Sequence, residues 1–213
     1  MTTVLNPSEP KVILRGISWD TYERLLAEHE EDSNTPCTSD SGTLEIMLLS
    51  ARHDKPHRLL AFLVEVCAET LALHVENFGS TTLKHPALRK GCEPHSCFYI
   101  QHAAMMHDRE EVDWTVGPPP DLIIEIAITP PSLNPWPIYA AIGVPEVWRY
   151  DGRQRHLYHL RNGDYDVRPY SLAFPPLTEV HLTGFLEARK HQASTAWVRA
   201  IRTWAQAQSP GAS

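Results

Sequence analysis

The sequence predicts a mixed α/β domain, of the α+β type, in which a central β-sheet is flanked by helices. Three observations lead to this prediction. A β-branched apolar run occupies residues 121–128, where a strand buried on both faces is expected. Apolar residues recur at helical spacing over residues 56–74. Short strand-like segments follow residue 143 and are separated by Asp-Gly and Asn-Gly turns.

Ordinary local signals define the first half of the chain. Ser18 is a suitable N-cap for a helix over residues 18–31, and a stretch rich in Ser, Thr, Asp and Pro predicts a loop over residues 33–42. Pro56 suits the first turn of the amphipathic helix, and a polar loop is expected to end at Gly117. Three short strands are expected, at residues 44–48, 75–83 and 96–101.

Strands and helices are also predicted to alternate in the second half of the chain. Three prolines precede the buried run at residues 121–128. A short helix is expected at residues 137–142, with proline at its start and Gly143 just past its end. Strands are expected at residues 145–150, 155–160 and 164–170. Two helices close the chain, and the second carries three large apolar residues on one face, Trp197, Ile201 and Trp204.

Length and composition restrict the class of protein. A chain of 213 residues with 42% hydrophobic and 21% charged residues is typical of globular proteins, which excludes wholesale disorder. No apolar run approaches a membrane span, the N-terminus lacks a secretory signal, and four scattered cysteines make no disulfide scaffold. We expect a cytoplasmic protein with no membrane partner. Residues 1–16 are expected to be a loose leader, residues 17–208 a single domain, and residues 209–213 a flexible tail.

The negative charge is concentrated in one segment. Residues 17–45 contain eight acidic residues and one arginine, which accounts for the whole formal net charge of −7. The balance argues mildly against constitutive nucleic-acid binding. The neutral remainder contains two basic clusters, which fit either a local basic surface or solvated helix ends and loops. They are Arg52, Lys55 and Arg58, and Lys84, Arg89 and Lys90.

The central run contains two carboxylates. Because side chains alternate along a strand, Asp121, Ile123, Glu125 and Ala127 are expected on one face. Carboxylates in such an apolar setting are costly to bury unless a cation, a basic side chain or a backbone donor compensates them. Hard cations such as Mg²⁺ prefer these oxygen ligands. Two interpretations stay open: a metal site, or Asp121 at a solvent-exposed strand start with Glu125 paired to an arginine.

A second polar group lies where an acid–proline pair enters an aromatic strand. Its Cys92, His95 and Cys97 suggest zinc, but the Cys-x4-Cys spacing has no matching second pair, so structural zinc is disfavoured. His102 and His107 are expected to be surface histidines rather than ligands. The sequence has no Walker-type loop, dinucleotide fingerprint or serine-nucleophile elbow.

Five segments carry a resemblance to a known family. They are Gly79-Ser80-Thr81-Thr82, Gly91-Cys92-Glu93-Pro94 with the strand that follows, the run at residues 121–126, Ile128-Thr129, and residues 137–151. These segments resemble the bacterial Uma-type restriction-endonuclease family, most specifically in the Val-Pro-Glu-Val-Trp-Arg-Tyr-Asp sequence that ends at Asp151. The resemblance extends from about Ile17 to the last helix. It implies the PD-(D/E)xK nuclease fold, and therefore one restriction endonuclease-like domain over residues 17–208.

This resemblance implies metal-assisted hydrolysis of phosphodiester bonds by carboxylates that hold Mg²⁺ or Mn²⁺. Carried over by position, Glu125 is the acid of the central strand and Glu45 is a recurrent acid at the start of the sheet. Glu125, Asp121 and His95 are the catalytic candidates, and these three with Glu45 are the candidate metal ligands. Two departures matter. His95 stands where the family usually has aspartate, and Ala127 stands where it commonly has another acid. Histidine suits Mn²⁺ better than Mg²⁺.

Three functions, each of a different class, are consistent with these residues and with the resemblance. The first is a metal-dependent endonuclease that hydrolyses DNA, impaired or altered by His95 and Ala127. The alternative is a catalytically degenerate nuclease-fold protein that binds nucleic acid or a protein partner. A third, an interaction module without a nucleic-acid role, is supported only by the negative net charge.

A homodimer is also expected, because duplex cleavage needs two active sites and the chain is too short for two nuclease domains. Two aromatic surfaces are candidate interfaces. They are the face of Trp197, Ile201 and Trp204, and the hairpin near Tyr158 and Tyr165. The alternative interpretation, which the pattern slightly favours, is that both tryptophans simply pack the last helix onto the sheet.

Overall fold

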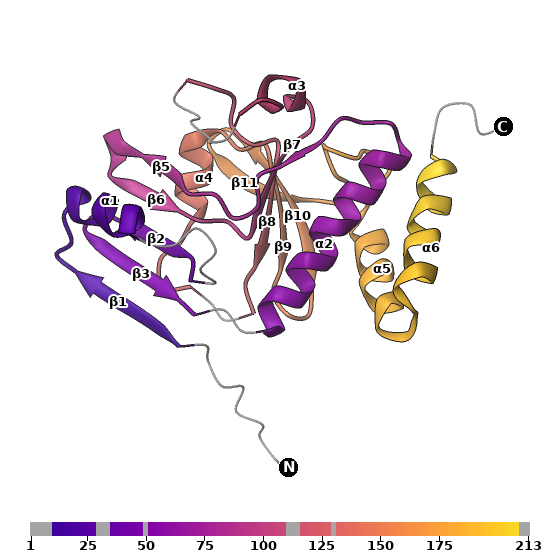
Figure 1. The fold of residues 1–213 in the computed structure, drawn as a ribbon, viewed down its shortest axis with the longest axis horizontal. Helices are drawn as coiled ribbons and strands as arrows, with labels where there is room; N and C mark the ends of the chain where they lie inside the picture. Colours follow the sequence, from indigo (N-terminus) through magenta and orange to yellow (C-terminus); the bar gives the residue numbers. More distant parts are fainter. Residues whose placement is uncertain (1–9, 29–34, 49–50, 110–115, 129–130, 209–213) are drawn as a thin grey trace, which may run out of the picture.

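The computed structural model describes residues 10–28, 35–48, 51–109, 116–128 and 131–208, with the side chains of 51–53 excepted. Its strands form two sheets, one of six strands and one of five (Figure 1). The larger sheet has the order β11-β10-β9-β8-β7-β4, and the smaller has the order β1-β3-β2-β6-β5. Helices α2, α5 and α6 lie on one side of the larger sheet. The predicted mixed sheet flanked by helices is confirmed.

The larger sheet has β8 near its middle. Its strands are β4 (Glu76–Asn77), β7 (Ser96–Tyr99), β8 (Leu122–Ile126), β9 (Glu146–Tyr150), β10 (Arg155–Arg161) and β11 (Asp164–Arg168). Within the described residues, β8 and β9 are the parallel pair and the other neighbours are antiparallel. The parallel register places Glu125 beside Arg149. The turn between β10 and β11 has the expected positive φ values, 52° at Asn162 and 88° at Gly163.

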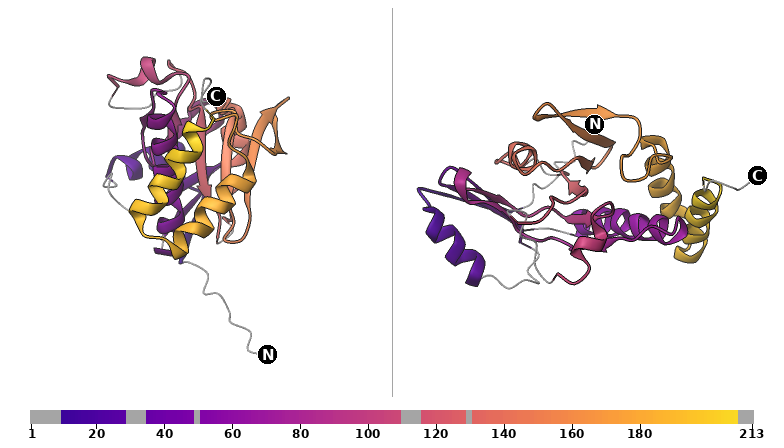
Figure 2. Two further views of the ribbon diagram at one scale, coloured as in Figure 1. Left: turned by 90° about the vertical axis from the view of Figure 1, so that its right-hand side faces the viewer. Right: turned by 90° about the horizontal axis from the view of Figure 1, so that it is seen from above.

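The side chains of β8 alternate between two cores, as its sequence predicts. Leu122, Ile124 and Ile126 are buried in the main cluster with α2 (Ala51–Thr70). Ile123 is buried on the other face, in a cluster that contains Ile138 and Tyr139 of α4 (Trp136–Ile142). Figure 2 shows α2 and α4 on opposite sides of the sheet. Glu125 is in phase with Ile123 and therefore faces α4.

The two C-terminal helices pack on α2. They are α5 (Glu179–His191) and α6 (Ser194–Gln206). Trp197 and Ile201 are fully buried in the main core, and the Trp197 indole N–H donates to the Phe185 carbonyl at 2.7 Å. Helix packing therefore covers Trp197 and Ile201, as the packing interpretation expects, and the third residue of this face, Trp204, is half-buried against the same core.

The smaller sheet has a core of its own. Its strands are β1 (Lys11–Arg15), β2 (Cys37–Asp40), β3 (Thr43–Met47), β5 (Leu83–His85) and β6 (Lys90–Cys92). Helix α1 (Trp19–Glu28) packs on it through Tyr22, which clusters with Cys37 and Leu44. Two expectations fail here. Residues 11–15 of the expected leader pair along their whole length with β3, and the expected loop at 33–42 contains β2.

Three further observations complete the fold. The polar segment after β7 contains a short helix, α3 (Ala103–Met106), where only a loop was expected, and a 3₁₀ turn, η1 (Pro86–Leu88), joins β5 to β6. The expectations for residues 1–9, 29–34 and 209–213 lie outside the described residues. Among the helices that are described, none has the length and apolarity needed to cross a membrane.

Candidate active site

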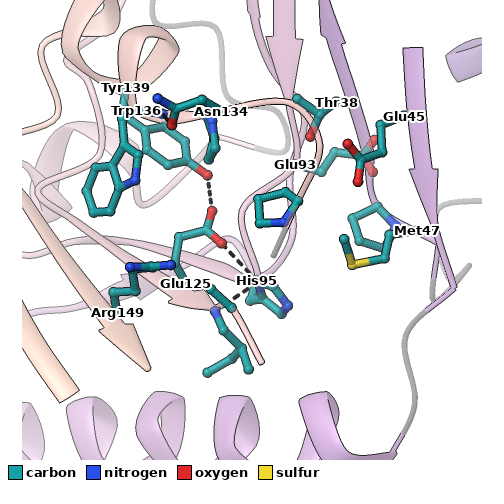
Figure 3. A pocket seen from close by; sticks show the side chains of 15 residues that line it. Thr38, Glu45, Met47, Glu93, His95, Glu125, Asn134, Trp136, Tyr139 and Arg149 are labelled. Carbon is teal, nitrogen blue, oxygen red and sulfur yellow. Dashed lines mark hydrogen bonds and ion pairs between the residues drawn. The ribbon is translucent and has the colours of Figure 1, made fainter. Parts of the chain in front are cut away.

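A cavity of about 350 Å³ lies between the two sheets (Figure 3). Thr38, Glu45 and Met47 line it from the smaller sheet, and Glu125 and Arg149 line it from the larger one. The remaining lining residues come from the end of β8, from the connections and from α4. They are Pro36, Glu93, His95, Ile126, Ala127, Pro131, Asn134, Pro135, Trp136 and Tyr139. Three of the four candidate residues from the sequence, Glu45, His95 and Glu125, therefore share one cavity.

His95 and Glu125 form the centre of this cavity. The Nδ1 atom of His95 lies 3.3 Å from Glu125 Oε2, and the backbone N–H of Ile126 donates to the same Nδ1 at 3.3 Å. Strand register explains the encounter. Ser96 of β7 lies opposite Ile124 of β8, so the preceding residue of the antiparallel strand is opposite Glu125. Pro94 comes between β6 and β7, where the chain passes from one sheet to the other.

Tyr139 holds the second oxygen of Glu125. Its hydroxyl donates to Glu125 Oε1 from α4, which ends at Gly143 in the left-handed conformation with φ 88°. Burial, together with the negative charge of Glu125, raises the pKa of Tyr139 well above its usual value. The phenol therefore stays protonated and acts as a hydrogen-bond donor. Glu125 is thus oriented through both of its oxygens.

Two further carboxylates line the cavity but also hold its walls. Glu45 Oε2 accepts the backbone N–H groups of Ser132 at 2.7 Å and Leu133 at 2.8 Å, while its Oε1 lies 3.9 Å from Lys11 Nζ. Glu93 accepts the backbone N–H of Cys37 at 2.9 Å and the Thr82 hydroxyl at 2.8 Å. Each therefore ties together segments that are distant in the sequence.

Asp121 lies outside the cavity. Its carboxylate accepts the backbone N–H of Ile100 at 2.7 Å and that of His102 at 3.1 Å, and it lies 2.7 Å from the His102 ring Nδ1. It is 4% exposed, so it is not a solvent-exposed strand start either. Four residues of strand separate it from Glu125, a distance of about 13 Å. The structure does not bring Asp121 together with the other candidates, because it anchors the chain that follows β7.

Across the described ranges, the four cysteines are not part of a group of three close metal-ligand atoms. All four are buried and free, and burial, together with Glu125, raises the pKa of the Cys92 thiol well above its usual value. Burial also raises the pKa of Cys97 to about 12. Thiols of this kind stay protonated, whereas zinc binds the thiolate.

Sequence analysis missed three residues that complete the cavity. Tyr139 and Arg149 lie inside a segment used for the family resemblance, but no spacing connects either with Glu125, and Glu93 was noted only as part of a motif. The relation of these residues to Glu125 exists only in the folded structure and not in the spacing of the sequence. Arg149 reaches the site through the parallel pairing of β8 with β9, and Tyr139 reaches it through the packing of α4.

The His95–Glu125 pair fits a divalent cation. Two ligands at about 2.1 Å from one ion, in adjacent positions, lie about 3 Å apart, close to the 3.3 Å between Nδ1 and Oε2. Within the described residues, the cavity offers no group of three acid or histidine ligand atoms within 4.8 Å of one another. An ion held by this pair would take the Nδ1 lone pair in place of the Ile126 N–H and would leave its remaining positions to water and phosphate, as Mg²⁺ commonly does.

Comparisons with known proteins place this cavity in a family context. A solved structure described as a "putative nuclease" of DUF820 from Anabaena variabilis shares the fold, with a TM-score of 0.53 and 14% identity over 79% of this chain and 98% of that chain. No curated protein matches significantly. The family model of Uma2, described as "Putative restriction endonuclease", matches residues 19–189. Because this match covers most of the chain, the chain belongs to the Uma2 family.

Proposed function

We propose that this protein is a metal-dependent nuclease that hydrolyses DNA phosphodiester bonds in the cavity around Glu125. The observation that carries the proposal is the His95–Glu125 pair, two side chains from adjacent strands with ligand atoms 3.3 Å apart in the cavity of a nuclease-family fold. His95 and Glu125 would hold a Mn²⁺ or Mg²⁺ ion. Such an ion, when bound, supplies Lewis acidity and lowers the pKa of a coordinated water.

The charges of the cavity support the need for a cation. Glu45, Glu93 and Glu125 line it, and Arg149 is the basic residue among its lining side chains. A phosphodiester carries a negative charge and would be repelled by three carboxylates, so a cation between them is required for close approach. Arg149 can donate to a phosphate oxygen from the neighbouring strand, the role that a lysine usually fills.

A basic pocket beyond the end of β8 supports nucleic acid as the substrate. This pocket, of about 400 Å³, is lined by Ile128 and by four cations, Lys55, Arg155, Arg189 and Lys190. Ala127, which lies just past the end of β8 and next to Ile128 in the chain, lines the active-site cavity. Arg155 and Lys190 of this pocket share Glu187 as an acidic partner. Three cations of the clusters noted in the sequence, Arg58, Lys84 and Lys90, also pair with acidic residues. Phosphates flanking the cleaved bond would contact the four cations.

Plasmid cleavage tests the proposal. The purified protein should nick or linearise supercoiled DNA in the presence of Mn²⁺ and lose this activity when Glu125→Ala removes the central ligand. Glu69→Ala is the matched control, because Glu69 is an exposed acid on α2 that pairs only at the surface with Arg202. Equal cleavage by the Glu125→Ala and parent proteins would refute the assignment of the cavity.

A second candidate is a catalytically degenerate protein that binds nucleic acid or a protein without cutting. It is favoured by Ala127, which lines the cavity without a ligand atom, and by the use of Glu45 and Glu93 as structural acceptors. Fluorescence anisotropy with labelled duplex DNA separates the two candidates. Binding without cleavage in either metal supports the second, whereas metal-dependent loss of intact duplex supports the first.

The proposal includes a homodimer located in the cytoplasm. Cutting both strands of a duplex requires two cavities, and a two-fold axis would supply them from identical chains. With the α6 face buried, the hairpin of β10 and β11 is the remaining candidate interface.

A further inference from the structure

A cluster of three side chains lies near the edge strand β4, at the other end of β7 from His95. His74 Nε2 lies 2.9 Å from Glu76 Oε1, and His107 Nδ1 lies 2.6 Å from the same oxygen. The ring centroids of the two histidines are 5.2 Å apart. Across the described ranges, this is the group in which three acid or histidine ligand atoms lie within 4.8 Å of one another.

The fold explains how the three residues meet. Residues i and i+2 of an extended segment point to the same side, so the His-x-Glu spacing presents His74 and Glu76 together. Glu76 of β4 pairs with Tyr99 of β7, and α3 follows β7 directly in the chain. His107 is the C-cap residue of α3. The carboxylate of Asp121 holds the start of this connection, so the acid that lies outside the active site supports this cluster instead.

We propose that His74, Glu76 and His107 form a binding site for a divalent transition-metal ion, with Zn²⁺ as the preferred ion. Two imidazole nitrogens and one carboxylate oxygen are a donor set of three-ligand zinc sites, which keep a fourth position for water or another ligand. The same set suits Mg²⁺ poorly, because imidazole favours transition metals. The site is distinct from the cavity around Glu125 and is independent of the proposed nuclease activity.

The distances are compatible with an ion after a small adjustment. Ligand atoms at about 2.1 Å from a tetrahedral ion lie about 3.4 Å apart, so the present separations of 2.9 and 2.6 Å need to widen by less than about 1 Å. The side chains of His74 and His107 are 49% and 64% exposed, which leaves both rings free to rotate. An ion at this point would tie α3 to β4.

Zinc titration of the full chain tests this site. The Glu125→Ala protein is stripped of metal with a chelator and titrated with Zn²⁺ by calorimetry, so that the cavity ligand does not contribute. We expect one equivalent of Zn²⁺ to bind. Adding His74→Ala or His107→Ala should weaken binding at least tenfold, whereas His191→Ala, at an exposed histidine near the end of α5, should leave it unchanged. Zn²⁺ should also raise the Tm of the Glu125→Ala protein, but not that of the protein that also carries His107→Ala.

These measurements distinguish a metal site from a cluster of three side chains that is held only by hydrogen bonds. No Zn²⁺ binding, or equal binding after His107→Ala, would overturn the proposal and leave two histidines that share one carboxylate. Glu76→Gln provides a second variant, because it keeps the size of the side chain and removes its charge. Plasmid cleavage by the His107→Ala protein should equal that of the parent, so a failure here is distinguishable from a failure of the nuclease proposal.

Discussion

Buried acidic residues connect separate segments of this protein through hydrogen bonds, and Glu146 is the clearest example. It is fully buried and accepts hydrogen bonds from the Trp148 indole at 2.8 Å, the Ser171 hydroxyl at 3.1 Å, and the backbone N–H groups of Leu172 and Ala173 at 3.0 and 2.8 Å. Glu146 lies in the segment with the most specific family resemblance. That segment therefore contributes an internal anchor, while Arg149, three residues later, faces the cavity.

The substitution His95→Asp tests the metal preference of the cavity. An aspartate beside Glu125 adds an oxygen ligand and a negative charge, so Mg²⁺-supported cleavage should increase relative to the parent protein. The parent protein should cut better with Mn²⁺ than with Mg²⁺. Initial rates in each metal provide the measurement. If both proteins are equally inert, the defect is assigned to Ala127 or to the absence of a lysine on the strand rather than to His95.

From the environment of His57 we expect the protein to lose stability in mild acid. It lies against the active site, with Nε2 2.7 Å from the Ser96 hydroxyl and its ring 5.8 Å from that of His95. Burial, with the nearby His95, lowers the pKa of His57 to about 4 from an ordinary value near 6.5. Between these values the unfolded chain binds more protons, so the free energy of unfolding falls as the pH falls from about 6.5 to 4.

Urea unfolding at pH 7 and pH 5 measures this effect. The His57 contribution should be complete above about pH 6.5 and should fall by about 2 kcal/mol at pH 5. The His57→Gln protein should lose less stability than the parent over the same interval. The same loss in both proteins would show that other groups cause the acid sensitivity.

At the scale of elements, close contact between α1 and β6 makes a sharp prediction. A Cβ atom at Gly91 would lie 2.4 Å from the Tyr22 hydroxyl oxygen and 2.9 Å from two carbons of its ring. Gly91→Ala should therefore destabilise the protein by about 1–3 kcal/mol through overpacking. Gly184→Ala is the matched control. Its Cβ meets nothing within 4 Å inside α5, so it should stabilise the protein by about 1 kcal/mol. Denaturant unfolding of the two variants measures whether each substitution lowers or raises the free energy of unfolding.

The elements also show what the sequence can predict and what it cannot. The apolar run of β8, the stripe of α2 and the turn at Asn162-Gly163 are predictable because each is specified by local chemistry. Strand β2 was missed because its residues are mostly polar, although Cys37 and Ser39 are buried and alternate with half-buried neighbours. Strand β1 is exposed along its length and gains its form only by pairing with β3.

The candidate site was predictable to a similar extent. His95 and Glu125 were found because residue type and family resemblance agree there. Arg149 and Tyr139 depend on strand register and helix packing, which no local pattern encodes. Asp121 was assigned to the wrong place because period-two alternation fixes a face of a strand but not the end of the sheet at which a cavity forms.

At the scale of the whole molecule, the proposed homodimer has a testable interface. Strand β11 is an edge of the larger sheet and carries Val167, which is 54% exposed. An exposed edge strand offers unpaired N–H and C=O groups to a second copy about a two-fold axis. Light scattering at micromolar concentration should give about twice 24.1 kDa. Val167→Asp should shift the mass toward the monomer, and Leu88→Asp, 45% exposed on the 3₁₀ turn η1, should not. A parent mass of one chain would exclude a stable dimer.

The cavity between two sheets also has a consequence for engineering. Its two walls meet in one apolar cluster, where Leu83 and Cys92 of the smaller sheet pack with Ile123 of the larger one, while Tyr22, Cys37 and Leu44 form a further core on the smaller sheet. Randomising Thr38 and Met47 would reshape the wall opposite Glu125 without disturbing the strands that carry Glu125 and Arg149. Selection for new ligands can thus act on one half of the molecule while the other half keeps its reactive groups in register.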